Sequence, residues 1–279
     1  MSTTTRFRPG PRWGVAVARL RIPLAAFAIV AMLFDALVGL PLPRFTSLVL
    51  VLAALALYFR GGRVHATPTL LDAPVTGRWF AVNSPADKVP SHGLHAYGQT
   101  YAVDLISRPT GEWKLDLHWR GPHTRPPEEY PGFGAPVLAP ADGVVVRAKT
   151  SQRDHGARTS WPGVLLMTAE GALMEATGRI LGNHVVIDIG EGRYVALAHL
   201  RRGSVTVRPG DAVQAGQHIG ECGNSGNSSE PHLHVQVMDA PSIFFGAGLP
   251  MRFRGLVTEA GDEVDVPANE QAVLASPVH

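Results

Sequence analysis

The sequence Pro231-His232-Leu233-His234-Val235 follows a loop of glycine, serine and asparagine at 223–229. Side chains on a strand alternate between the two faces of a sheet, so His232 and His234 should share one face while Leu233 points to the buried side. Two neighbouring strand histidines often have no metal, but a catalytic zinc takes about three protein ligands and a water. The stretch therefore predicts half of a metal site, whose other ligands must lie upstream.

The best upstream ligand is Asp104, which ends the strand-like run Tyr101-Ala102-Val103. A solvated surface aspartate is less expected after such an apolar run. Carboxylate oxygen is an ordinary zinc ligand, and together with imidazole nitrogen it makes a common catalytic donor set. Asp104 and the two strand histidines are therefore predicted to lie together.

Short runs bounded by glycines predict a small all-β domain around this site. The segments 182–190 and 194–200 have the β-branched, alternating pattern of an antiparallel hairpin, with His199 at the end of its second strand. The segments 135–146 and 207–220 have closely spaced turn glycines and the same character, which makes them partners.

These motifs together resemble the M23 family of zinc metallopeptidases, of the LytM or lysostaphin type. The resemblance rests on Ala-Pro-Ala-Asp-Gly-Val-Val at 139–145, Ala-His-Leu at 198–200, the Pro-Gly-Asp and Ala-Gly-Gln turns, and the Gly-Asn-Ser-Gly-Asn-Ser…Pro-His-Leu-His terminus. It covers about residues 80–240. It implies an antiparallel β-sheet or sandwich domain that binds Zn²⁺ through Asp104 and His234, with His199 and His232 as catalytic neighbours.

The chain departs from the family pattern at the first ligand. The family has a histidine four residues before the aspartate, and that position is Thr100 here. Two histidines farther upstream could take its place, His92 and His95. Longer-spaced relatives favour His92, and His95 remains the alternative. The seven remaining histidines are predicted to be structural or exposed: His65, His118, His123, His155, His184, His218 and His279.

The predicted activity is that of a zinc endopeptidase acting on peptide cross-links or stem peptides of peptidoglycan. A zinc held by two imidazoles and one carboxylate lowers the pKa of its water toward about 7. One alternative is a non-catalytic M23-like module that binds the cell wall or regulates other proteins. A weaker alternative is a lipoyl- or biotinyl-type carrier domain, which would need Lys149 on an exposed hairpin tip.

Composition limits the other classes of function. The formal net charge is +2, and the basic residues are dispersed outside the N-terminus, so nucleic acid is not an expected partner. Cys222 is the only cysteine, which excludes an intrachain disulfide and indicates a small buried side chain.

The N-terminal region predicts a membrane anchor. After the basic segment 1–21 come two apolar runs, 22–40 with one charge and 45–59 with none, so residues 22–60 are predicted to be membrane-anchoring helices. The leading arginines favour a cytoplasmic N-terminus, and two full spans would return the domain to that side. The resemblance favours an extracytoplasmic domain in a bacterial envelope, which a single span or an exported N-terminus would allow.

The remaining boundaries follow from these assignments. Residues 61–89 are predicted to be a linker with an edge strand at 78–82, and 90–240 to be the peptidase domain. Insertions at 107–134 and 150–181 should shape the substrate groove. The segment 241–279 is predicted to hold a hairpin at 252–266 and then a disordered tail.

Overall fold

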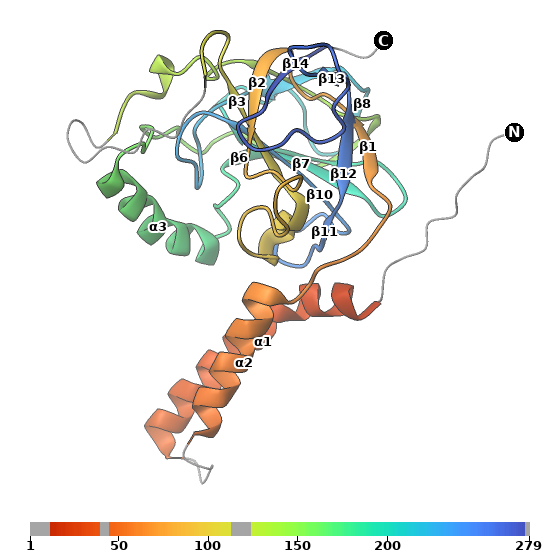
Figure 1. Ribbon diagram of the computed structural model, residues 1–279. Helices are drawn as coiled ribbons and strands as arrows, with labels where there is room; N and C mark the ends of the chain where they lie inside the picture. Colours follow the sequence, from red (N-terminus) through yellow and green to blue (C-terminus); the bar gives the residue numbers. More distant parts are fainter. Residues whose placement is uncertain (1–11, 40–44, 113–123, 277–279) are drawn as a thin grey trace, which may run out of the picture.

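The structure is a computed structural model that describes residues 12–39, 45–112 and 124–276. It has a β domain from which a pair of helices projects (Figure 1). The described helices are α1 (Arg12–Val38), α2 (Thr46–Arg60) and α3 (Trp161–Ala176), with short 3-10 turns η1 (Ala96–Tyr101) and η2 (Pro127–Glu129). The other regular elements of the described residues are strands, which confirms the prediction of a mainly β domain.

One sheet of ten strands forms the centre of the domain, and all its pairings are antiparallel. The strand order is β13-β14-β2-β3-β10-β7-β6-β5-β8, and β11 pairs with β10 off this path. The strands are β2 (Gly77–Val82), β3 (Val103–Ser107), β5 (Gly143–Lys149), β6 (Asn183–Asp188), β7 (Tyr194–Leu200), β8 (Ala212–Val213), β10 (Leu233–Met238), β11 (Gly248–Leu249), β13 (Leu256–Val257) and β14 (Ala272–Ala275).

Two small sheets complete the strand pairings. In one, β4 (Pro136–Leu138) pairs antiparallel with β9 (His218–Glu221), and in the other β1 (Thr69–Asp72) pairs parallel with β12 (Met251–Arg254). The predicted hairpin at 182–200 is confirmed as β6 and β7. The predicted partnership of 135–146 with 207–220 is also confirmed, because β4 pairs with β9 and β5 with β8.

The central strand β10 is buried along its whole length, and its two faces differ. Leu233, Val235 and Val237 belong to the main hydrophobic core together with apolar residues of β3, β6 and β7. His234 and Gln236 alternate with them and therefore lie on the opposite face. Alternation thus fills the core with one row of side chains and presents the other row to the functional site.

The segment predicted as a linker, 61–89, instead contributes two strands, β1 and β2. The predicted edge strand at 78–82 is interior, since β2 lies between β14 and β3. Trp79 and Ala81 of this strand are buried in the main core. Sequence patterning missed this because the prolines around β2 are typical of a linker.

The C-terminal segment also differs in part from its prediction. The two arms of the predicted hairpin at 252–266 do face each other. Backbone N–H groups of Phe253, Thr258 and Val264 donate to the carbonyls of Asp265, Asp262 and Leu256, and Val257 forms a bridge with Glu263. The first arm, β12, also pairs with β1, which was not predicted. The tail predicted to be disordered forms β14, which pairs with β2 and buries Val273 and Ala275. Lys149 ends β5 opposite His184 and is not at a hairpin tip. The carrier-domain alternative is therefore wrong.

The two predicted insertions have different outcomes. Residues 113–123 of the first lie outside the described residues, and the remainder includes η2. The second contains α3, which lies beside the sheet on the left of Figure 1. Ser160 caps this helix, since its hydroxyl oxygen accepts a hydrogen bond from the Gly163 N–H at 3.1 Å.

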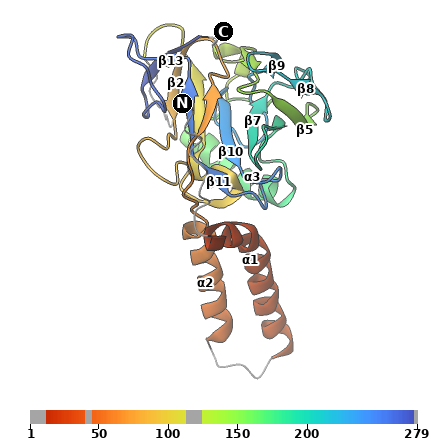
Figure 2. The same ribbon diagram turned by 90° about the vertical axis from the view of Figure 1, so that its right-hand side faces the viewer.

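The helices α1 and α2 lie side by side and project away from the β domain in both views (Figures 1 and 2). Among the described residues no single helix is long and apolar enough to cross a membrane. The pieces Gly14–Arg21 and Pro23–Val38 of α1 reach that length only together, and they are bent by 46°. Pro23 explains the bend, because it removes a helical hydrogen bond and its ring clashes with the preceding turn. The predicted membrane anchor is therefore not established by the helices.

Candidate metal centre

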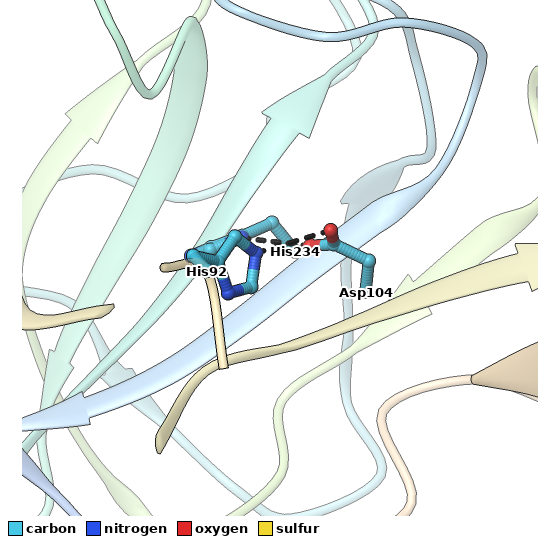
Figure 3. A group of neighbouring side chains, drawn as sticks. All are labelled: His92, Asp104 and His234. Carbon is cyan, nitrogen blue, oxygen red and sulfur yellow. Dashed lines mark hydrogen bonds and ion pairs between the residues drawn. The ribbon is translucent and has the colours of Figure 1, made fainter. Parts of the chain in front are cut away.

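The residues of the site come from two adjacent strands and one loop. His234 of β10 lies directly opposite Asp104 of β3 in the sheet register, so both side chains are on the same face. His92 reaches them from the loop that precedes η1. One ligand atom from each of these three residues lies within 4.8 Å of the others. Figure 3 shows the three side chains converging, with dashed lines from both imidazoles to the carboxylate.

The hydrogen bonds of His234 determine which ring nitrogen is free. Gln236 uses its amide N–H to bond the Tyr97 carbonyl at 2.9 Å, which turns its amide oxygen toward His234. His234 Nε2 donates to that oxygen at 2.8 Å. In the neutral ring, Nδ1 then has a lone pair, and it lies 2.8 Å from Asp104 Oδ1.

His92 has the corresponding arrangement. The Ser91 hydroxyl donates to the Gln99 carbonyl at 3.1 Å, so its oxygen can accept a hydrogen bond from His92 Nδ1 at 3.0 Å. This leaves a lone pair on His92 Nε2, which lies 3.1 Å from Asp104 Oδ2. Two imidazole lone pairs therefore point toward one carboxylate from different sides.

Charge at Asp104 is stabilised strongly. Burial alone would raise the pKa of its carboxyl, but His92 and His232 beside it, and the short contacts of His234 and His92 with its oxygens, hold that pKa well below its usual range. The Asn83 amide N–H donates to Asp104 Oδ2 at 2.9 Å and orients the group. The pKa of His92 is lowered by burial, whereas Asp104 outweighs burial and raises that of His234.

This donor set fits a divalent cation. Lone pairs facing a carboxylate repel one another unless a positive charge lies between them, and a metal ion supplies that charge. Two nitrogen donors and one carboxylate oxygen form a common ligand set for catalytic zinc, which keeps its fourth position open. In such sites the ring nitrogen that does not face the metal is usually hydrogen-bonded to a neighbouring group. Ser91 makes this bond to His92, and Gln236 makes it to His234.

His199 and His232 lie beside this group but are held differently. Their Nδ1 atoms donate to backbone carbonyls at 2.8 Å, those of Ser225 and Glu230 respectively. Each Nε2 can then accept a proton. The centroids of the two imidazole rings are 4.7 Å apart, and His232 Nε2 is 3.5 Å from Asp104 Oδ1. Burial first, and then the neighbouring His232 and His234, keep the pKa of His199 well below its usual range.

His199 has a left-handed backbone with φ of +62°, which is uncommon for a side chain of this kind. Its N–H bonds the Leu181 carbonyl at 3.0 Å, and its carbonyl accepts from the Gly223 N–H at 3.0 Å. The glycine is required there, because an added Cβ would lie 2.3 Å from the Arg201 nitrogen. The loop at 223–229 therefore fixes His199 as well as leading into β10.

A cavity of about 260 Å³ opens at this cluster. Four histidines and Asp104 line one part of it, and α3 and the segment after it line another. Apart from Asp104 and the four histidines, the lining residues are Asn83, Leu94, Tyr97, Gln99, Met167, Ile180, Leu181, Asn227 and Ser229. The combination of polar and apolar walls suits a peptide, which has both kinds of surface.

His95, the alternative first ligand, lies outside the group. Its Nδ1 lies 3.1 Å from the Thr100 hydroxyl, and it does not line the cavity. Among the histidines predicted to be structural or exposed, His155 Nε2 bonds the Gly226 carbonyl and His184 Nδ1 bonds that of Gly182. His118, His123 and His279 lie outside the described residues.

Sequence reasoning missed the residues that orient the site. Gln236 continues the alternation of His232 and His234, so its position on the same face could have been read from the strand pattern. The position of Asn83 could not be predicted in this way. Asn83 follows β2 with a left-handed φ of +51°, in a segment that was predicted to be a linker. Asp104 is the second residue of β3 and does not end a strand, because Ala96–Tyr101 forms η1.

Part of the chain matches a known protein family. Residues 130–243 match the model of peptidase family M23, a range that includes His199, His232 and His234 but not His92 or Asp104. The chain is 30% identical over 179 residues to the peptidoglycan DD-endopeptidase ShyA of Vibrio cholerae, covering 57% of this chain and 35% of ShyA. It is 31% identical over 98 residues to the cell division protein DipM of Caulobacter vibrioides, covering 34% of this chain and 16% of DipM. The chain thus spans about a third or less of these relatives.

Among solved structures, the catalytic domain of the antimicrobial peptidase lysostaphin from Staphylococcus simulans is similar at 21% identity and a TM-score of 0.32, covering 62% of this chain and 88% of that domain. The match to the family model includes three of the four histidines of the site, and the relatives named above include a peptidoglycan endopeptidase. They support the presence of a peptidase family M23 domain in this chain, related to peptidoglycan endopeptidases.

Proposed function

We propose that the chain is a zinc-dependent endopeptidase that hydrolyses peptide bonds in the cross-links or stem peptides of peptidoglycan. The observation that carries this proposal is the convergence of His92 Nε2 and His234 Nδ1 on the Asp104 carboxylate, at 3.1 Å and 2.8 Å. His92, Asp104 and His234 would hold the metal. When bound there, zinc supplies Lewis-acid polarisation of a carbonyl and water of lowered pKa.

The residues beside the ligands would handle the proton and the developing charge. A histidine with its Nδ1–H bonded to a carbonyl presents Nε2 as a base, and once protonated it becomes a hydrogen-bond donor. His199 and His232 both have this form. One can accept the proton of the attacking water, and the other can donate to the tetrahedral oxyanion.

The second candidate is a non-catalytic M23-like module that binds peptidoglycan without hydrolysing it. The open cavity of about 260 Å³ beside two available histidine bases favours the enzyme. A module without turnover has no need for buried imidazoles whose Nε2 atoms are kept unprotonated by burial, as His199 is.

We further propose that α1 and α2 hold the domain at the membrane, with the catalytic domain on the extracytoplasmic side. The projecting helices expose many large apolar side chains, of which Leu37 is 84% exposed. The only charge between residues 22 and 38, Asp35, accepts a hydrogen bond from the Ser47 hydroxyl at 2.5 Å. Flotation of the intact chain with phospholipid vesicles should be lost in a Phe27→Asp, Leu33→Asp variant. If that variant still floats, the two helices are not the anchor.

Hydrolysis of isolated peptidoglycan by the purified intact chain tests the main proposal. The expected result is zinc-dependent release of new amino groups, abolished by a chelator and restored by added zinc. Binding of zinc and of peptidoglycan without release of amino groups would instead establish the non-catalytic module.

A further inference from the structure

A second cavity, of about 270 Å³, is lined by α3, by the segment that follows it and by the loop 152–158. The helix presents Met167 to the first cavity and Glu170, Leu173 and Met174 to the second. Arg179 lines the second cavity, and the next residue, Ile180, lines the first. The two cavities are therefore neighbours that share α3 and the segment following it.

Positive charge predominates in this second cavity. Three arginines line it, Arg153, Arg158 and Arg179, against one carboxylate, that of Glu170. Arg158 donates to Glu170 through Nη2, whereas no carboxylate pairs with Arg153 or Arg179 among the described residues. The pKa of the Lys149 ammonium is lowered by its burial and by Arg179 nearby, so a fourth positive charge lies close. Such a cluster of positively charged side chains is stabilised by a bound anion.

Two buried polar atoms in the lining have no hydrogen-bond partner among the described residues. One is a donor, Nη1 of Arg158, whose residue is only 4% exposed. The other is an acceptor, Oε1 of Gln152, whose residue is 7% exposed. A buried unpartnered polar atom is energetically costly, so a ligand that satisfies both atoms would bind favourably.

A ligand that satisfies both atoms must offer an anionic acceptor and an N–H donor together. The end of a peptide does so, because its carboxylate lies next to its last amide N–H. Guanidinium groups bind carboxylates in a planar, two-point geometry. Leu173 and Met174 add an apolar wall for an aliphatic side chain. Inorganic phosphate has the charge but neither the amide donor nor the apolar part.

We propose that this second cavity binds the terminal carboxylate and adjoining amide of the peptide whose other part enters the metal centre. The identification of this peptide as the substrate rests on the proposed function, but binding by the cavity does not. The cavity would favour peptides with a free carboxylate beyond the bond that is cleaved.

Binding can be measured on the intact chain treated with a chelator, so that no carboxylate can bind zinc. The probes are N-acetylalanine, its neutral amide N-acetylalaninamide, and inorganic phosphate, followed by NMR titration. N-acetylalanine should bind at least about tenfold more tightly than the amide, since a hydrogen bond to a charged group is stronger than one to a neutral group. Phosphate should bind more weakly than N-acetylalanine.

The exposed arginines provide variants that leave the buried structure intact. An Arg153→Gln, Arg179→Gln double variant should weaken N-acetylalanine binding about tenfold. An Arg252→Gln variant is the matched control, because Arg252 lies on β12 and its nearest carboxylate, Asp265, is 3.9 Å away. Arg158→Gln should abolish binding, and the exposed double variant decides the matter if Arg158→Gln does not fold. Equal binding of acid and amide, tighter binding of phosphate, or unchanged binding in the double variant would overturn the proposal.

Hydrolysis then separates the two proposals. For peptides with a free terminal carboxylate, the double variant should raise KM about tenfold with kcat and zinc content unchanged. For the same peptides ending in an amide, KM should not change. If N-acetylalanine binds as expected but the zinc-loaded chain hydrolyses no peptide, the cavity assignment stands and the endopeptidase proposal fails.

Discussion

The four histidines around Asp104 form two pairs that differ in what holds their ring nitrogens. In His92 and His234 the outer nitrogen is bonded to a side chain, and the inner lone pair faces the carboxylate. In His199 and His232 the Nδ1 is bonded to a backbone carbonyl, and the Nε2 is left beside the carboxylate or the cavity. The first pair is oriented to hold a cation and the second to exchange a proton. The same residue type therefore has two uses, which are set by its hydrogen-bond partners.

The largest expected effect is on the first pair and its carboxylate. Replacing Asp104 with alanine removes one donor and the only negative charge between the two imidazoles, so zinc should no longer copurify with the chain. Elemental analysis measures this directly. Zinc near one equivalent in the Asp104→Ala variant would show that the three residues are not the metal site.

The two candidates for the first ligand should differ sharply. His92→Ala should lose zinc, because it leaves two protein donors, whereas His95→Ala should retain it. His95 is the matched control, since it is a histidine three residues away in the same loop and is buried outside the metal group. Zinc lost from the His95 variant but retained by the His92 variant would reverse the assignment.

Removing a member of the second pair should separate turnover from metal binding. His199→Ala and His232→Ala should each lower the rate of peptidoglycan hydrolysis by about a hundredfold or more, with zinc content unchanged. Their effect should be on kcat, measured with zinc in excess. Parent rates in both variants would remove the proposed roles of this pair.

A smaller effect is expected from the partners that orient the first pair. Ser91→Ala and Gln236→Met should each weaken zinc affinity by about 10- to 100-fold while leaving the ligands in place. Competition with a chromogenic chelator gives the affinity. A change below threefold in both would mean that the tautomers of His92 and His234 are not set by these contacts.

Much of this site can be predicted from the sequence because its residues follow local patterns. The pair His232 and His234 shares a face by strand alternation, and Asp104 has an apolar run before it. The first ligand is harder to predict, because Thr100 occupies the position where the family has its histidine. His92 lies in an irregular loop before Gly98, and such a loop has no periodicity from which its side-chain direction could be predicted. Gly98 itself fits only without a side chain, since an added Cβ would lie 2.6 Å from Met238.

The peripheral strands are less predictable for a different reason. β1, β2 and β14 are distant in sequence from most of their partners, and their pairing is decided by core packing of residues such as Trp79 and Val273. Local turn chemistry cannot choose among such partners. The central hairpin of β6 and β7 was predictable because its two strands are adjacent in the chain.

Zinc-edge X-ray absorption on the zinc-loaded intact chain tests the central claim most directly. We predict one zinc with two imidazole nitrogens at about 2.0–2.1 Å, one carboxylate oxygen at about 2.0–2.2 Å, and a further light-atom donor. In any zinc that the His92→Ala or His234→Ala variant retains, the number of imidazole ligands per zinc should fall from two to one. A first shell with no imidazole, or with the same imidazole count in both variants as in the parent, would contradict the assignment of His92, Asp104 and His234 as the metal centre.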